Sequence, residues 1–94
     1  MTGNVEHEPE RHRFVVRLAE GEGELVYRPT AAGALDLIHT GVDPQLRRRG
    51  IGEQLVRAAL AYARAHHMRI IPTCPFVARW LEKHPEERDL VAER

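Results

Sequence analysis

The run Arg47-Arg48-Arg49-Gly50-Ile51-Gly52 has the residue types and the spacing of an anion-binding loop. It follows a predicted strand that ends at Val42, and it opens a predicted helix. The first amides of a helix lack partners inside the helix, and the aligned peptide dipoles add partial positive charge there. Glycine lets a phosphate approach the backbone, and arginine adds forked donors. The pattern predicts a phosphate site; a solvated turn without a ligand is the alternative.

Cys74 is the only thiol of the chain, and it directly precedes Pro75, a residue that favours the first turn of a helix. A helix N-terminus lowers the pKa of a thiol and so populates the thiolate. Acyl transfer from a thioester donor to this thiol would exchange one thioester for another, which makes an acetyl-cysteine intermediate feasible. The alternative is that Cys74 is a small buried hydrophobic residue.

His39 lies three residues before Val42 on a strand predicted over 34–42. Alternation of side chains places it on the face of Leu35 and Leu37. An imidazole with a pKa near neutrality can take the proton of an attacking amine. The alternative is a hydrogen-bonded histidine of the core. Among the other histidines, we expect His84 to cap a helix, and we expect no metal site.

The elements that position these residues follow from hydrophobic periodicity. The sequence predicts three strands over 13–18, 24–28 and 34–42, a helix over about 50–66, a short strand over 68–71 and a second helix between Pro75 and Pro85. Short turns between the three strands predict an antiparallel meander. The i,i+4 pairs Phe76/Trp80 and Val77/Leu81 predict the buried face of the second helix, and residues 89–91 are predicted to pack back.

Length and composition limit the classes of function. The 94 residues predict one domain over 12–94, preceded by a polar, flexible tail over 1–11. The 14 basic residues balance the 14 acidic ones, which argues against binding an extended nucleic acid. One cysteine cannot form an internal disulfide, and no apolar run suits a membrane span or a signal peptide, so we expect a cytoplasmic protein.

The pattern Arg47-x-x-Gly50-x-Gly52 after a strand resembles the acetyl-CoA signature of the GNAT (Gcn5-related N-acetyltransferase) superfamily. The likeness spans residues 39–91 and is closest to a short, single-domain branch of that superfamily. It rests on His39-Thr40-x-Val42, Ala63-Arg64, Pro72-x-Cys74-Pro75-Phe76, Trp80, His84-Pro85-Glu86 and Asp89-Leu90-Val91.

The resemblance implies an α/β (α+β) fold whose sheet splays open and holds coenzyme A. The pantetheine arm would lie against Thr40, Gly41 and Val42, and the pyrophosphate would bind the loop of Arg47, Arg48, Arg49, Gly50, Ile51 and Gly52. Cys74 and His39 would lie nearest the acetyl group and act as catalytic residues. This branch lacks the segments that usually shape the acceptor site, so the resemblance does not identify the acceptor.

The sequence therefore predicts an N-acetyltransferase that takes acetyl-CoA as donor, needs no metal, and acetylates an unidentified amine of a protein or a small molecule. A CoA- or acyl-CoA-binding sensor or scaffold without robust turnover is the alternative. We expect no nucleic-acid or membrane partner, and a monomer or weak homodimer.

Overall fold

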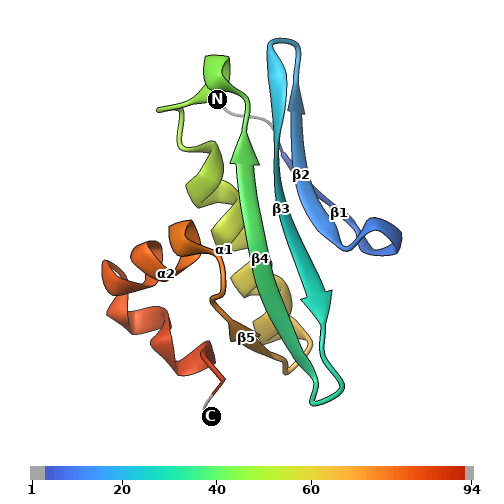
Figure 1. Cartoon of the computed structure of the whole chain (residues 1–94), viewed down its shortest axis with the longest axis vertical. Coiled ribbons are helices and arrows are strands. Elements are labelled where there is room, and N and C mark those ends of the chain that lie inside the picture. The colour runs from blue at the N-terminus through green and yellow to red at the C-terminus, as the bar shows by residue number, and fades with distance from the viewer. Residues whose placement is uncertain (1–3, 93–94) are drawn as a thin grey trace.

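The structure, a computed structural model, describes residues 4–92 and contains one mixed sheet with two α-helices (Figure 1). The strands are β1 (Val5–Glu8), β2 (Arg13–Leu18), β3 (Gly21–Pro29), β4 (Ala34–Val42) and β5 (Arg69–Ile71). They lie in the order β1-β2-β3-β4-β5. The first four pair antiparallel, and β5 pairs parallel to β4. The predicted α/β class and the meander of β2, β3 and β4 are confirmed.

Helix α1 (Ile51–Ala65) covers one face of the sheet, and α2 (Pro75–Glu82) packs beside β4 (Figure 1). The buried residues of α1 recur at helical spacing: Ile51, Leu55, Val56, Ala59, Leu60 and Ala63. They meet the buried face of the sheet, which includes Phe14, Val16, Leu25 and Leu37. Fully burying a side chain of this size contributes about 1.5–3 kcal/mol, so this layer is the main source of stability.

A β-bulge interrupts the pairing of β3 with β4. Val26 lies opposite His39 and Tyr27 lies opposite Leu37, so Ile38 is the extra residue on β4. A bulge of one residue shifts every later side chain to the other face of the sheet.

The bulge overturns the predicted orientation of His39. Thr40 pairs with Leu25 and therefore points to the buried face, which also carries Leu37. His39 points to the opposite face and is exposed, so the prediction that it shares a face with Leu35 and Leu37 is wrong. Simple alternation fails here because it assumes an uninterrupted strand.

The N-terminal segment is more ordered than its composition predicts. Residues 5–8, expected to belong to a flexible tail, form β1 and pair with β2, whereas residues 1–3 lie outside the described residues. His7 stacks on Phe14 with ring centroids 4.3 Å apart. On the other face, Glu6 and Glu8 form ion pairs with arginines of β2. Because of these long-range contacts, a segment of polar sequence forms an edge strand of the sheet.

The sheet opens between β4 and β5. Only Ala34–Asp36 of β4 pairs with β5, and the next connection is the Cys74 amide, which donates to the Leu37 carbonyl at 2.8 Å. Pro72, directly after β5, has no amide to donate to a ladder. No strand among residues 4–92 pairs with the edge of β4 over 38–42, so this backbone stays available.

The chain then returns to the sheet, as predicted. A 3-10 helix, η3 (Pro85–Leu90), follows α2, and Val91 forms a parallel bridge with Ile70. Two further 3-10 helices are η1 (Pro9–Arg11) and η2 (Pro44–Leu46). None of the helices in the described part of the chain is long and apolar enough to cross a membrane.

Candidate functional site

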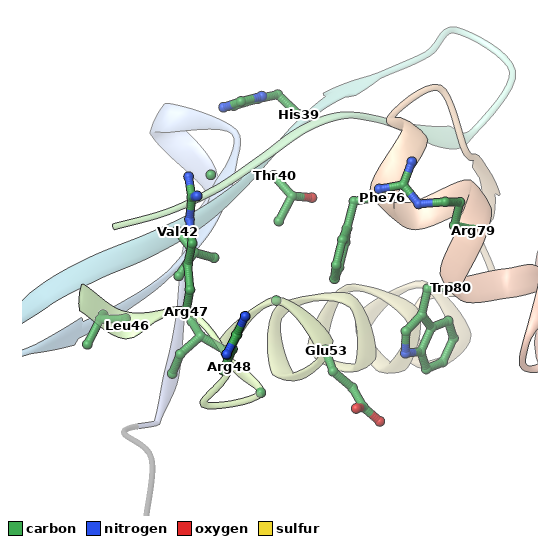
Figure 2. Close-up of a pocket in the computed structure, with 14 residues that line it drawn as sticks. His39, Thr40, Val42, Leu46, Arg47, Arg48, Glu53, Phe76, Arg79 and Trp80 are labelled. Atoms are coloured by element: carbon green, nitrogen blue, oxygen red, sulfur yellow. The ribbon is translucent and has the colours of Figure 1, made fainter. Parts of the chain in front are cut away.

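One hollow of the described structure, called here the main cavity, has a volume of about 750 Å³. It lies between the open edge of β4, the start of α1 and one side of α2 (Figure 2). Its lining consists of His39, Thr40, Gly41, Val42, Leu46, Arg47, Arg48, Gly50, Ile51, Gly52, Glu53, Phe76, Arg79 and Trp80. Eight of the nine predicted cofactor-binding residues therefore gather around one cavity.

The floor of the main cavity is the uncapped N-terminus of α1. Gly50 is the N-cap residue, with a left-handed φ of 76°, and no side chain caps the helix. Arg48 is also left-handed, with a φ of 69°, a conformation that costs a non-glycine residue about 1–3 kcal/mol. This geometry leaves the amides of the first helical turn free to bind an anion.

Gly50 and Gly52 have different structural roles. A Cβ on Gly50 would meet nothing within 4 Å, so Gly50 is needed for its backbone conformation. A Cβ on Gly52 would lie 2.7 Å from Cζ of Phe76, so this position admits no side chain while the ring stays where it is. Gly52 thus lets the Phe76 ring of α2 pack against the start of α1.

Three arginines give the main cavity an unbalanced positive charge. Arg47, Arg48 and Arg79 are exposed, and none of them forms an ion pair or a side-chain hydrogen bond with residues 4–92. The one carboxylate of the lining, Glu53, is paired with Arg57 at 2.8 Å. An excess of cationic side chains in a neutral protein favours a polyanionic ligand.

Arg49 departs from the prediction. It was expected to bind the same anion as its neighbours, but it is absent from the described lining. Its guanidinium instead lies 3.3 Å from the carboxylate of Glu20. The loop therefore sends two of its three arginines toward the main cavity and one toward the β2–β3 turn.

The two faces of β4 carry different chemistry at the main cavity. Figure 2 shows Thr40 directed into the hollow and His39 on the other side of the strand. His39 still borders the cavity along the edge of β4. A base at this position would serve a group that approaches from the face opposite α1.

Cys74 lies at the inner end of the opening. It is the N-cap residue of α2 and is only 4% exposed. Its Sγ lies 3.5 Å from the Thr40 hydroxyl, and it is not part of the described lining. Burial alone would raise the pKa of this thiol. The Thr40 hydroxyl and the backbone amides around the sulfur outweigh burial and hold the pKa below its ordinary value.

Comparison with known proteins identifies the kind of domain that carries this cavity. The family model for GCN5-related N-acetyl-transferase matches residues 13–90. The chain belongs to the GCN5-related N-acetyltransferase family. The match covers the sheet from β2 onward, the anion-binding loop and both α-helices.

Two relatives support this membership. Protein NATD1 of Bos taurus is 32% identical over 83 residues, which cover 86% of this chain and 74% of that protein. The NMR structure of a GCN5-like protein from Staphylococcus aureus superposes with a TM-score of 0.75 at 25% identity, covering 97% of this chain and 89% of that one. The GNAT-like fold predicted from the loop motif is confirmed.

Five residues of the lining were not predicted to bind a ligand: Leu46, Glu53, Phe76, Arg79 and Trp80. Phe76 and Trp80 were assigned to the buried face of α2, and Trp80 is indeed only 7% exposed. Arg79 could not be predicted as a site residue, because the sequence does not show which face of α2 lies toward α1. Among residues 4–92, no group of three or more potential ligand side chains could hold a metal ion.

Proposed function

We propose that the protein transfers an acetyl group from acetyl-CoA to an amine. The observation that carries this proposal is the meeting, in one cavity, of the unpaired edge of β4 with the uncapped N-terminus of α1 and two free arginines. Coenzyme A has the matching chemistry, because a charged pyrophosphate is joined to an arm with two amide groups. An edge of β-strand can pair with amides, and a helix N-terminus with arginines can hold a pyrophosphate.

The assignment of donor contacts follows from this match. The first amides of α1 would bind the pyrophosphate, with Arg47 and Arg48 above them. The backbone of Thr40, Gly41 and Val42 would pair with the pantetheine arm. The arm would then point along β4 toward Cys74, where the opening of the sheet ends.

We propose Cys74 and His39 as the catalytic residues. The Cys74 thiolate attacks the acetyl carbonyl and forms a new thioester, and CoA leaves as its thiolate. The amine then attacks this acetyl group from the opposite face of β4, His39 takes the amine proton, and the Cys74 thiolate is released. Since Cys74 is 4% exposed, the first step requires the side chains around it to shift.

Binding and turnover are tested separately. Calorimetry with acetyl-CoA and CoA should show binding at micromolar to millimolar ligand, and the Arg47→Ala/Arg48→Ala variant should bind more weakly. Turnover is followed as free CoA thiol released in the presence of a panel of protein and small-molecule amines. Absence of binding at millimolar acetyl-CoA would refute the proposal at its first step.

The role of Cys74 has its own test. Intact-mass analysis after exposure to acetyl-CoA should show one added acetyl group on the wild type and none on Cys74→Ser, a variant that keeps the size of the side chain. Because Cys74 is the only cysteine, no other thiol can account for the added mass. Full turnover by Cys74→Ser would show that acetyl passes directly to the amine. His39→Gln should lower turnover most at neutral pH while leaving CoA affinity unchanged.

A CoA sensor or scaffold is the second candidate function. The burial of Cys74 and the position of His39 favour it, because Cys74 does not line the main cavity and His39 borders it only from the other side of β4. Micromolar CoA binding with no amine acetylated and no acetyl-cysteine would support this candidate.

A further inference from the structure

The α2 side of the main cavity contacts neither the proposed pyrophosphate site at α1 nor the proposed pantetheine site on β4. This α2 wall consists of Phe76, Arg79 and Trp80, one helical turn of α2 that faces the start of α1 (Figure 2). Arg79 is exposed, and its guanidinium makes no ion pair or hydrogen bond with the rest of the described chain. It thus places a third positive charge on the cavity, on a different element from Arg47 and Arg48.

Trp80 adds a hydrogen-bond donor without a partner. The side chain is 7% exposed, and its indole Nε1 is buried with no hydrogen-bond acceptor in the described structure. A buried donor left unpaired costs about 1–3 kcal/mol, and native proteins seldom tolerate one without a reason. In Figure 2 the nitrogen lies on the side of the ring that faces the cavity and Glu53.

The tryptophan ring is held in a fixed orientation. It stacks on His84 with centroids 3.8 Å apart and an interplanar angle of 12°, and the Nδ1 of that histidine hydrogen-bonds the Trp80 carbonyl at 2.8 Å. The guanidinium of Arg57 lies 5.2 Å from the ring centroid. Packing on both sides therefore fixes the direction of the unpaired N–H, and the Arg57 that contacts the ring is itself paired with Glu53 of α1.

Coenzyme A has a second anionic group that the α1 loop does not account for. Its adenosine carries a 3′-phosphate, separated from the pyrophosphate by the ribose, and its adenine and ribose offer further hydrogen-bond acceptors. A ligand with two separated anionic groups fits a cavity with cationic side chains on two separate elements. The α2 wall provides the second cation and a spare donor together.

We propose that the α2 wall binds the 3′-phosphoadenosine end of coenzyme A, with Arg79 on the 3′-phosphate and the Trp80 indole N–H on an acceptor of the same nucleotide. This assignment rests on the proposed CoA-binding function and names the residues that distinguish CoA from shorter pantetheine compounds. Arg79 selects for the phosphate, and Trp80 selects for the nucleoside.

The first experiment compares three ligands by calorimetry: CoA, dephospho-CoA and 4′-phosphopantetheine. The wild type should bind CoA about tenfold more tightly than dephospho-CoA, since an arginine–phosphate contact is charge-assisted. Arg79→Ala should lose most of this preference while binding dephospho-CoA like the wild type. The matched control is Arg88→Ala, which removes an exposed arginine of η3 that lines no part of the main cavity.

The second experiment uses the single tryptophan of the chain. The indole ¹H–¹⁵N resonance should shift on adding CoA or dephospho-CoA and stay in place with 4′-phosphopantetheine. Trp80→Phe keeps the aromatic packing and removes the donor. The free variant should keep a cooperative melting transition. It should bind both nucleotides several-fold more weakly than the wild type and 4′-phosphopantetheine equally well.

The outcomes separate this inference from the proposed function. If CoA binds, and Arg79→Ala weakens all three ligands equally or none of them, the assignment of Arg79 is wrong and the function stands. If the indole resonance ignores CoA, or moves equally with 4′-phosphopantetheine, the assignment of Trp80 is wrong. If none of the three ligands binds to the wild type, the proposed function itself fails.

Discussion

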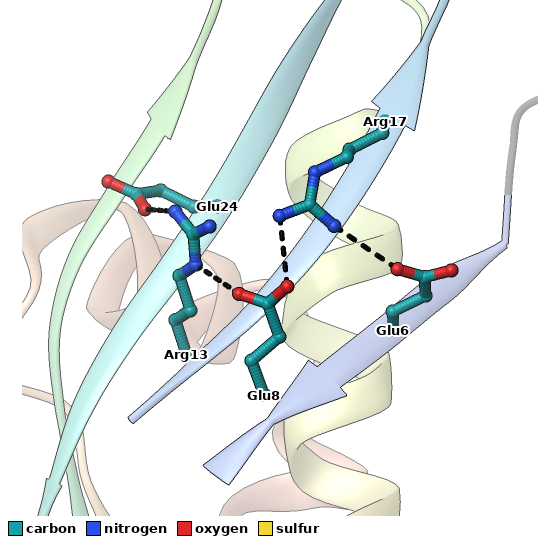
Figure 3. A network of polar contacts seen from close by, with 5 residues as sticks. All are labelled: Glu6, Glu8, Arg13, Arg17 and Glu24. Atoms are coloured by element: carbon teal, nitrogen blue, oxygen red, sulfur yellow. Dashed lines mark hydrogen bonds and ion pairs between the residues drawn. The ribbon is translucent and has the colours of Figure 1, made fainter. Parts of the chain in front are cut away.

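Arginine has opposite roles in two regions of this molecule. On the face of the sheet away from α1, Arg13 and Arg17 join Glu6, Glu8 and Glu24 in one network, with Arg13 bridging carboxylates at 2.7 and 2.8 Å (Figure 3). This network ties β1, β2 and β3 together and covers Val15, which is fully buried.

In the main cavity the arginines are unpaired. Arg47, Arg48 and Arg79 have no anionic partner among residues 4–92, so no ion pair of theirs stabilises the free protein. The comparison indicates that position, rather than residue type, separates a structural arginine from a binding one. The charge of the whole chain is zero and conceals both regions.

Removing two cavity arginines should have the largest effect. Arg47→Ala/Arg48→Ala should weaken CoA binding by about 10- to 100-fold, because hydrogen bonds to charged groups contribute about 1.5–3 kcal/mol each and these are partly screened by solvent. Calorimetry measures the affinity, and the melting temperature should stay the same or rise.

Arg49→Ala is the matched comparison for this double variant, because it changes the same loop and the same kind of charge. Its partner is Glu20 rather than a cavity ligand, so the loss of CoA affinity should be much smaller. Equal losses for Arg48→Ala and Arg49→Ala would mean that only the net charge of the loop matters.

Gly52→Ala should have the next largest effect, and it acts through packing instead of charge. The new methyl would overlap Phe76 at 2.7 Å, a cost of about 1–3 kcal/mol that outweighs the gain of up to about 1 kcal/mol in helix propensity. We expect a lower free energy of unfolding and weaker CoA binding, measured by urea denaturation and calorimetry. Adding Phe76→Leu should recover part of the stability; no recovery would mean that the ring is not what excludes the methyl.

The two glycines show how far sequence reasoning reaches in this chain. The loop motif alone predicted a helix start at an anion site, because an uncapped N-terminus and a glycine are local features. It could not predict that Gly52 also accommodates Phe76, since that contact joins residues 24 positions apart in two different helices. Arg79 and Trp80 were missed for the same reason, because only the packing of α2 against α1 brings them to the cavity.

Strand positions were predicted well and side-chain faces less well. The 34–42 strand was predicted at its true bounds, but the bulge at Ile38 moved His39 to the opposite face. A bulge depends on the fit between two strands, so a single strand's pattern does not reveal it. The strand at 5–8 was missed because its acidic residues become favourable only beside Arg13 and Arg17.

Removing an arginine from the ion-pair network should have the opposite result to removing cavity arginines: stability should fall and CoA affinity should not change. Arg13→Ala removes the bridge between Glu8 and Glu24 and leaves those carboxylates to repel each other. The melting temperature should fall by about 2–5 °C, the range expected for a surface pair in a domain of this size, while CoA affinity stays unchanged. Arg28→Ala, which removes an exposed arginine without a described partner, is the control. A large loss of CoA affinity in Arg13→Ala would show that the two regions are coupled.

A change of pH should have the smallest effect on stability. It distinguishes the ion-pair network on one face of β1 from the more buried face that carries His7. Burial lowers the pKa of His7 below 6.5, and nearby His66 lowers it further while Glu10 opposes them. The His7 Nε2 lies 2.6 Å from the Tyr27 hydroxyl oxygen, and the ring is neutral there. Its stabilising contribution is complete above pH 6.5 and is lost as pH falls through 6.5 toward the folded-state pKa, because the unfolded chain binds the proton more readily.

Glu8, on the other face of β1, contributes to stability over a different range of pH. Hydrogen bonds from Arg13 and then Arg17 hold its pKa below 4.5, so its contribution is complete above pH 4.5 and is lost at more acidic pH. Melting temperatures between pH 3 and 8 should therefore fall in two steps, each smaller than the loss expected for Arg13→Ala. His7→Gln should flatten the step below pH 6.5, and Arg13→Ala should flatten the step below pH 4.5. If either variant flattened both steps, the two faces of β1 would act as one titrating unit and not as separate regions.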